Sequence, residues 1–203
     1  MTLRRWFLPE TPDVLGLLRH QRAVTIKGVD AFAAWAAGDA SAAQTLRDAG
    51  GDGDMAKREL LTALRAAFVT PLEPEDLFTL SRSIDRILYY SRDLVNESEA
   101  MACAPDAGIA EMAKLVGDAL RHIDSAIVSV GSNGDEATAS ADAAIETERE
   151  LEHSYYAGMA ALLRVDDRTE RIARRELYRR CSRIGEMVID VAERVIYAVV
   201  KQS

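Results

Sequence analysis

Acidic side chains spaced one helical turn apart mark the C-terminal half of the sequence. Glu148 and Glu152 form one i, i+4 pair, and Glu186 and Asp190 form a second pair on a later predicted helix. Like charges at this spacing repel each other, so a pair on each of two helices needs compensation. A shared cation would supply it, because carboxylate oxygens bind hard metal ions. The two pairs therefore form a candidate metal site.

The corresponding positions in the N-terminal half lack half of these carboxylates. Gly50 precedes Asp54, and Tyr89 follows Asp85, at the same spacing of four residues. Each pair has thus lost one acidic member. The asymmetry suggests a duplicated metal-binding bundle that is altered in one copy.

The surroundings of the acids bear on whether they bind a metal. Glu148 falls in line with Leu151 and Leu162 on the expected apolar face of its helix, where an ionised carboxylate is costly unless it is paired. Glu186 and Asp190 lie off the apolar face of theirs. An acidic helix face is usually just solvated, so spacing alone leaves a metal-free interpretation open.

Surface ion pairs would account for the acidic residues without a metal. Arg183 precedes Glu186 by three residues and Arg194 follows Asp190 by four, so each acid has a basic neighbour within one turn of its own helix. In this interpretation the protein is a structural helical adaptor without a metal.

A ferritin-like metal-dependent enzyme is a second alternative. Glu150 and His153 have the Glu-x-x-His spacing of di-iron bundles, but those bundles need two such motifs. Neither of the other histidines, His20 and His122, has an acid three residues before it. The sequence therefore favours a protein that is not an enzyme.

Arginines recur every three or four residues near the start of the last predicted helix. They are Arg164, Arg168, Arg171, Arg175, Arg179 and Arg183. Acidic residues between them make a solvated, salt-bridged face the ordinary interpretation. The functional interpretation is a docking surface for an acidic partner or a phosphate-bearing ligand, with Arg168, Arg171, Arg175 and Arg179 as its contacts.

Composition narrows the class of protein. The chain has 203 residues, of which 48% are hydrophobic, enough for a sizeable core. A net charge of −8 disfavours nucleic acid and anionic membranes as partners.

Cys103 and Cys181 are too few for a disulfide framework, so we expect both in the core of a cytoplasmic protein. Met1–Pro9 contains too few apolar residues for a signal peptide. No stretch of the sequence reaches the roughly 18 apolar residues of a membrane span.

Abundant alanine, leucine and arginine, with few β-branched runs, predict an all-α chain of six helices. The expected spans are about 11–38, a helix within 39–69, 75–100, 105–131, 136–164 and 166–203. Gly50, Gly51 and Gly53 should break or fray the front half of the second helix. The sixth has a coiled-coil-like apolar seam, made of Leu177, Cys181, Ile184, Val188, Val191, Val195 and Ala198. Matching helical hairpins suggest one domain built from two tandem three-helix repeats, about 10–102 and about 105–203.

With these residues placed, the chain resembles the PhoU-like proteins, specifically the phosphate-transport regulators associated with low-affinity inorganic phosphate transporters. Three passages carry the resemblance: Trp6–Pro9, the hairpin from Lys57 through Pro71 to Asp76, and the closing helix with Glu186 and Asp190. The resemblance implies two three-helix repeats with paired acidic motifs that hold zinc or iron clusters in some members. It also implies a cytoplasmic, non-enzymatic regulator of phosphate transport.

Carried over by position, the resemblance implies a usable metal site at Glu148, Glu152, Glu186 and Asp190. The first repeat keeps only Asp54 and Asp85, with Asp93 one turn further on, while Arg82 and Arg86 replace residues that are commonly acidic. An ion-pair network is the alternative there. The implied partner is an inorganic phosphate transporter or a signalling protein, with membrane association only through that partner, and a homodimer is a further expectation.

Overall fold

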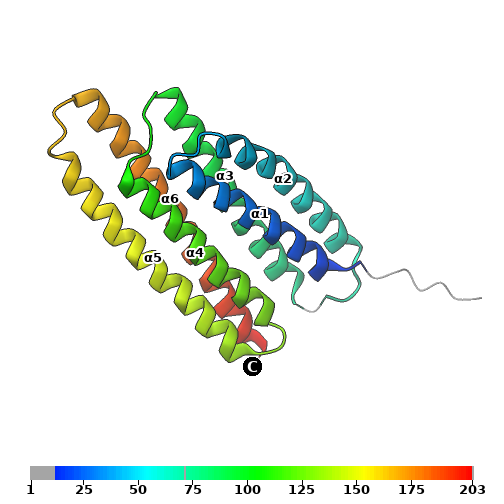
Figure 1. The fold of residues 1–203 in the computed structure, drawn as a ribbon. Coiled ribbons are helices and arrows are strands. Elements are labelled where there is room, and N and C mark those ends of the chain that lie inside the picture. The colour runs from blue at the N-terminus through cyan, green and yellow to red at the C-terminus, as the bar shows by residue number, and fades with distance from the viewer. Residues whose placement is uncertain (1–11, 71, 203) are drawn as a thin grey trace, which may run out of the picture.

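The computed structural model describes residues 12–70 and 72–202, in which six helices and no strands are found (Figure 1). The helices are α1 Val14–Ala36, α2 Ala42–Ala66, α3 Pro74–Ala100, α4 Ala107–Ser129, α5 Gly134–Leu162 and α6 Arg168–Gln202. The all-α fold of six helices is confirmed. None of the helices in the described residues has the length and apolar character needed to cross a membrane.

Polar side chains set where several helices begin. Asp13 caps α1 by accepting a hydrogen bond from the N–H of Gly16 at 2.8 Å, and Asp106 caps α4 through the N–H of Ile109 at 3.0 Å. These bonds satisfy backbone donors that have no partner within the helix. The first helix therefore starts after Asp13. The predicted start at Thr11, the passage Trp6–Pro9 and Pro71 lie outside the described residues.

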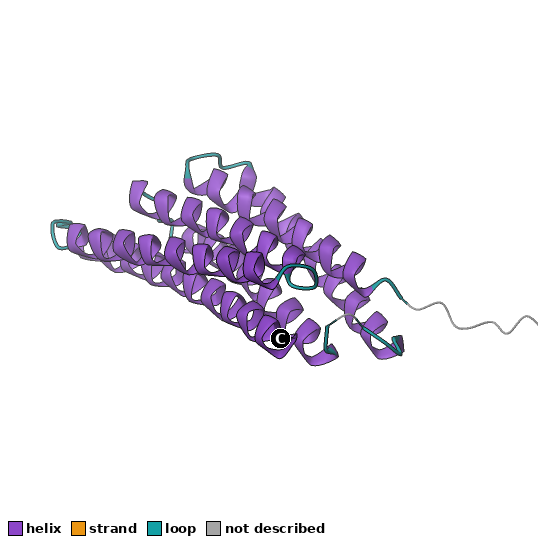
Figure 2. Cartoon of the chain, turned by 90° about the horizontal axis from the view of Figure 1, so that it is seen from below, coloured by secondary structure: helices purple, strands orange, loops and turns teal. Residues whose placement is uncertain are grey.

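The helices form two groups of three. α2 packs against α1 and α3, whereas α5 packs against α4 and α6, and the groups meet through α1 with α4 and α3 with α6. Figure 1 shows α2 and α5 on opposite flanks of the bundle, and Figure 2 shows from below that helices alone, joined by loops, make up the described chain. Each group matches the extent of one proposed repeat, although the repeat relation itself stays a prediction.

Helix α2 runs unbroken through its glycines, so the expected break or fraying there was wrong. Gly50 and Gly53 are buried where α2 crosses α3. A Cβ atom at Gly50 would lie 2.6 Å from Arg92 Nη1, and one at Gly53 would lie 2.9 Å from Leu88 Cδ2. Close packing between the two helices compensates for the low intrinsic helix propensity of glycine.

The apolar seam of α6 lies in the core as expected. All seven residues of the seam are buried, and Val188, Val191 and Val195 have no exposed surface. Cys103 and Cys181 are also buried free thiols, and burial raises the pKa of Cys181 to about 12. The helix therefore supplies a continuous apolar face to the surrounding helices.

Ion pairs join α3 to α6 along the neighbouring face. Asp76, only 2% exposed, lies 2.9 Å from Arg194 Nη2 and 3.2 Å from Lys201 Nζ. At the other end of α3, Asp93 lies 2.5 Å from Arg180 Nη1. The order of the pairs shows that the two helices run antiparallel. Each carboxylate thus has a cation on the facing helix, which offsets the cost of its burial.

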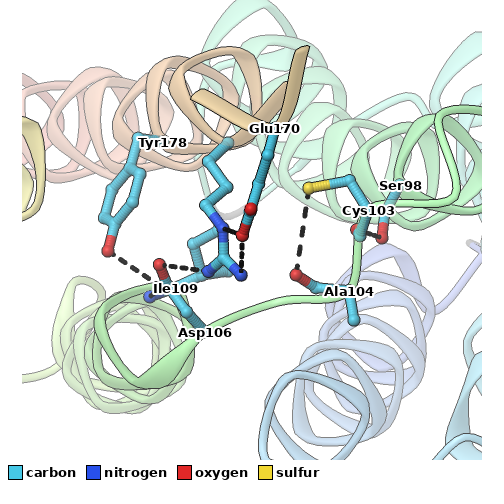
Figure 3. A network of polar contacts seen from close by, with 8 residues as sticks. Ser98, Cys103, Ala104, Asp106, Ile109, Glu170 and Tyr178 are labelled. Carbon is cyan, nitrogen blue, oxygen red and sulfur yellow. Dashed lines mark hydrogen bonds and ion pairs between the residues drawn. The ribbon is translucent and has the colours of Figure 1, made fainter. Parts of the chain in front are cut away.

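A polar network attaches the connection between the two halves to α6 (Figure 3). Asp106 accepts hydrogen bonds from the Tyr178 hydroxyl at 2.8 Å and from Arg174 Nη1 at 2.9 Å. Burial opposes ionisation of Asp106, but the bonds from Ile109, Tyr178 and Arg174 hold its pKa below the ordinary value. The connection from α3 to α4 is therefore held by side chains of the last helix.

The Tyr178 ring lies in a slot that a glycine keeps open. A Cβ atom added at Gly158 of α5 would lie 2.1 Å from Tyr178 Cε1 and 2.4 Å from Cζ. Gly51 offers a matched comparison, because it is also helical but a Cβ atom there would contact nothing within 4 Å. Substitutions at these two positions therefore distinguish the effect of close packing on stability from the effect of helix propensity.

We expect Gly158→Ala to destabilise the protein by about 1–3 kcal/mol, because the rigid, buried ring must move. Gly51→Ala should instead stabilise it by about 0.5–1 kcal/mol, since alanine favours an open helical position. Urea denaturation followed by circular dichroism measures both. Equal effects of the two substitutions would contradict the packing role of Gly158.

Candidate functional site

A cavity of about 470 Å³ lies between α5 and α6. Its lining consists of Glu152, Tyr155, Tyr156, Arg179, Ser182, Arg183, Glu186 and Met187. Two of the predicted metal ligands, Glu152 and Glu186, thus line one cavity, as does Arg179 from the predicted docking surface. The cavity therefore contains residues of both the predicted metal site and the predicted docking surface.

Glu148 lies beside these acids and is buried, as its helical position predicted. It is only 8% exposed, and it forms no hydrogen bond or ion pair with another described residue. Gly185 makes room for it, because a Cβ atom there would be 3.2 Å from Glu148 Oε1. Burial, with the charges of Glu152 and Glu186, raises the pKa of Glu148. The folded protein therefore holds a carboxylate whose charge is poorly compensated.

Asp190, the fourth predicted ligand, is placed differently. It is exposed, does not line the cavity, and lies 3.8 Å from Arg86 Nη1 on α3. The four acids are therefore only partly brought together. Glu148 interacts electrostatically with Glu152 and with Glu186.

The three glutamates fit a metal ion in donor type and charge, and Glu148 is also buried. Among the described residues, however, no group of three or more His, Cys, Asp or Glu side chains is already arranged to hold one. Glu152 accepts a hydrogen bond from the Tyr156 hydroxyl at 3.1 Å. A bound cation would therefore require side-chain rotation, at least of the exposed Glu152 and Glu186.

The acids of the N-terminal half are paired with basic side chains. Lys57 Nζ lies 3.5 Å from Asp54 and forms a salt bridge with Asp85 as well. Asp93 is held by Arg180 of α6. An ion-pair network therefore occupies these three positions, which was the alternative to a metal site there. The ammonium group of Lys57 supplies the positive charge that a cation would bring.

Two expected surface ion pairs do not form in the described residues. Arg194 pairs with Asp76 of α3 rather than with Asp190. The Arg183 guanidinium lies over the Tyr90 ring, 5.0 Å from its centroid, rather than against Glu186. Pairing within one helix was wrong because α3 packs against α6 and presents competing partners. Glu186 is consequently left without a basic partner among the described residues.

Glu150 and His153, the residues of the ferritin-like alternative, are exposed on α5. The His153 ring lies 2.7 Å from the carbonyl oxygen of Arg149 through Nδ1. Neither side chain lines the cavity.

Helix α6 contains all of the predicted arginine stripe except Arg164, which precedes it. Arg168, Arg175 and Arg179 are exposed, whereas Arg171 is half-buried and donates a hydrogen bond to the carbonyl oxygen of Val165. The salt bridges of this segment belong instead to Arg174 and Arg180, which lie on a different face. The stripe is thus largely free of salt bridges, while its role in docking stays a prediction.

Sequence reasoning missed Tyr156, Ser182 and Arg183 as residues of the cavity. The i, i+4 spacing of Glu152 and Tyr156 could have indicated their contact. No local sequence pattern could have placed Ser182 beside a cavity, because two different helices form the wall of the cavity.

The raised pKa of Glu148 predicts a pH-dependent stability in metal-free protein. Below its ordinary pKa the carboxyl is neutral in both folded and unfolded states, whereas at neutral pH folding must bury the charge. Glu148→Gln should therefore stabilise the protein at pH 7, on the order of 1 kcal/mol, with the gain vanishing near pH 4. Urea denaturation at each pH, in the presence of a chelator, measures this.

Glu150→Gln is the matched control, because Glu150 is an exposed glutamate on the same helix. It should change stability by less than about 0.5 kcal/mol at either pH. A Glu148→Gln effect that is the same at pH 4 and pH 7 would show that the buried charge is not its cause.

Comparisons with known proteins bear on the fold. No model of a known protein family matches the chain, and no curated protein sequence does. Among solved structures, a PhoU-like protein from Shewanella oneidensis MR-1 superposes with a TM-score of 0.73 at 12% identity, covering 92% of this chain and 99% of that one.

A candidate PhoU-like phosphate regulatory protein from the same organism gives a TM-score of 0.69 at 12% identity, covering 93% of this chain and 96% of that one. Both similarities extend over nearly the whole of each chain, so they concern the complete six-helix arrangement. The chain therefore has the fold of the PhoU-like proteins.

Proposed function

We propose that the protein is a non-enzymatic regulator or accessory protein of inorganic phosphate transport, and that it binds a metal ion such as zinc or iron in the α5–α6 cavity. The fold supports the regulatory part, because one structural neighbour is a candidate phosphate regulatory protein. The observation that carries the metal part is Glu148, a buried carboxylate without a partner among the described residues, next to Glu152 and Glu186.

In this proposal Glu148, Glu152 and Glu186 hold the metal. The ion neutralises their charge and links α5 to α6. Asp190 can join only after release from Arg86, 3.8 Å away. Asp54, Asp85 and Asp93 take no part, because Lys57 and Arg180 already neutralise them.

The partner is an inorganic phosphate transporter or a signalling protein. The exposed arginines of α6 would contact an acidic surface on that partner, with Arg168, Arg175 and Arg179 available for it. The protein would act in the cytoplasm, reach the membrane only through this partner and form a homodimer. Metal occupancy would bias the relative positions of α5 and α6, and hence the surface presented to the partner.

Metal binding is tested by elemental analysis of protein purified without chelator, and by thermal denaturation with added Zn²⁺. We expect bound metal, and stabilisation of about 2.7 kcal/mol at a free concentration one hundred times the dissociation constant. Glu148→Gln combined with Glu186→Gln should abolish both effects. Glu150→Gln with Glu146→Gln removes the same charge from the exposed side of α5 and should preserve them.

Absence of bound metal at any stoichiometry, with no response to Zn²⁺ or Fe²⁺, would favour the metal-free adaptor. Oxidation of added Fe²⁺ with turnover would instead favour the ferritin-like enzyme.

The docking role is tested by capture from membranes that contain an inorganic phosphate transporter. The protein should retain the transporter, and substitution of Arg168, Arg175 and Arg179 by Ser should reduce the retained amount at least about tenfold, because rim charges steer association. Control substitutions replace Arg19, Arg58 and Arg65, which are exposed on the other half. Equal loss in both variants would contradict a specific role for the arginine stripe.

A further inference from the structure

Opposite charges share the α5–α6 cavity without pairing. Arg179 and Arg183 line it together with Glu152 and Glu186. Among the described residues, neither arginine lies within ion-pairing distance of either glutamate. Unlike charges that line one cavity of about 470 Å³ yet stay apart leave space for a ligand between them.

The two arginines differ from their neighbours on α6. Arg174 is held by Asp106 and Glu170, and Arg180 by Asp93 and Glu97. Arg179 has no ion pair or hydrogen bond with a described residue, and the Arg183 guanidinium only faces the Tyr90 ring. Arg179 and Arg183 therefore keep their N–H donors available for a ligand.

A second hollow continues from the same two arginines. It measures about 140 Å³ and is lined by Tyr90, Glu176, Arg179, Arg180 and Arg183. Arg179 and Arg183 thus stand between two hollows, one leading to α5 and one to α3. Arg179 and Arg183 line both hollows, and the Arg183 guanidinium lies over the Tyr90 ring.

We propose that the cavity binds an oxyanion of the phosphate class together with the metal ion, with Arg179 and Arg183 holding the oxyanion. Guanidinium groups bind phosphate oxygens through paired, charge-assisted hydrogen bonds. A metal bound by Glu148, Glu152 and Glu186 would supply positive charge beside these arginines, and cations in proteins often combine carboxylates with phosphate oxygens. The inference rests on the proposed metal site and adds the oxyanion and its two ligands.

The charges of the cavity make the two ligands depend on each other. Without a metal, Glu152 and Glu186 of the lining and the buried Glu148 beside them repel an approaching phosphate and oppose the attraction of the two arginines. A divalent cation removes most of that repulsion and attracts phosphate itself. Phosphate affinity should therefore rise when the metal binds, and metal affinity should rise by the same factor when phosphate binds.

Equilibrium dialysis of the full chain with labelled inorganic phosphate, with and without Mn²⁺, tests this. Binding of Mn²⁺ is followed separately by electron paramagnetic resonance. We expect Mn²⁺ to increase phosphate affinity about tenfold or more. Arg179→Gln with Arg183→Gln should abolish the increase while the protein still binds Mn²⁺ in the absence of phosphate.

Arg58→Gln with Arg65→Gln is the matched control. It removes the same charge from exposed positions of α2 that do not line the cavity, and it should leave the increase unchanged. Circular dichroism establishes that each variant is folded. If the double variant does not fold, Arg179→Gln alone should weaken phosphate binding in the presence of Mn²⁺.

Phosphate binding that is equal with and without Mn²⁺, or equally weakened in the control variant, would overturn the inference and leave the metal site standing. Failure of the unmodified protein to bind Mn²⁺, Zn²⁺ or Fe²⁺ would overturn both. Phenyl phosphate distinguishes the source of the oxyanion: if it displaces labelled phosphate, the site accepts phosphomonoesters, and if it does not, the site is for free phosphate. Both phenyl phosphate results presuppose that metal-dependent phosphate binding has been measured. Both therefore support the inference.

Discussion

The packing of α6 is the constraint on which the rest of the structure depends. The helix touches α3, α4 and α5, and each side of it meets a different kind of surface. Its apolar seam lies in the core, Arg180 and Arg194 pair with acids of α3, and Arg179, Ser182 and Glu186 border the cavity toward α5. Because the seam has one low-energy orientation, it fixes the other two sides at the same time.

The two halves compensate their acidic side chains in different ways. In the N-terminal half, Lys57 neutralises Asp54 and Asp85 within the folded chain. In the C-terminal half, Glu148 is buried without such a partner among the described residues, and its pKa is raised. A group held at this cost is a reasonable place to expect a ligand, because its binding recovers free energy that folding has left unused. The N-terminal half thus neutralises these acids with its own side chains, whereas the charge of Glu148 is left poorly compensated.

The arginines of α6 show a similar contrast between paired and available charges. Arg174 and Arg180 are engaged by acids on other elements, so their charges help hold the fold. Arg179 is the neighbour of Arg180 in sequence but points to a different side of the helix, where no acid of the described residues pairs with it. Successive residues of a helix point about 100° apart, so Arg180 forms ion pairs that hold the fold while Arg179 faces the cavity.

The sequence by itself determined the number and kind of the helices, the seam of α6 and the burial of Glu148, because these depend on helical periodicity within one segment. Only the tertiary structure decided the rest. Gly50 and Gly53 stay helical because α3 packs against them, and Arg194 pairs with Asp76 because α3 and α6 run antiparallel. The joining of Glu152, Glu186, Arg179 and Arg183 around one cavity likewise depends on how α5 lies against α6. Contacts between distant segments depend on the packing of several helices at once, which no local spacing encodes.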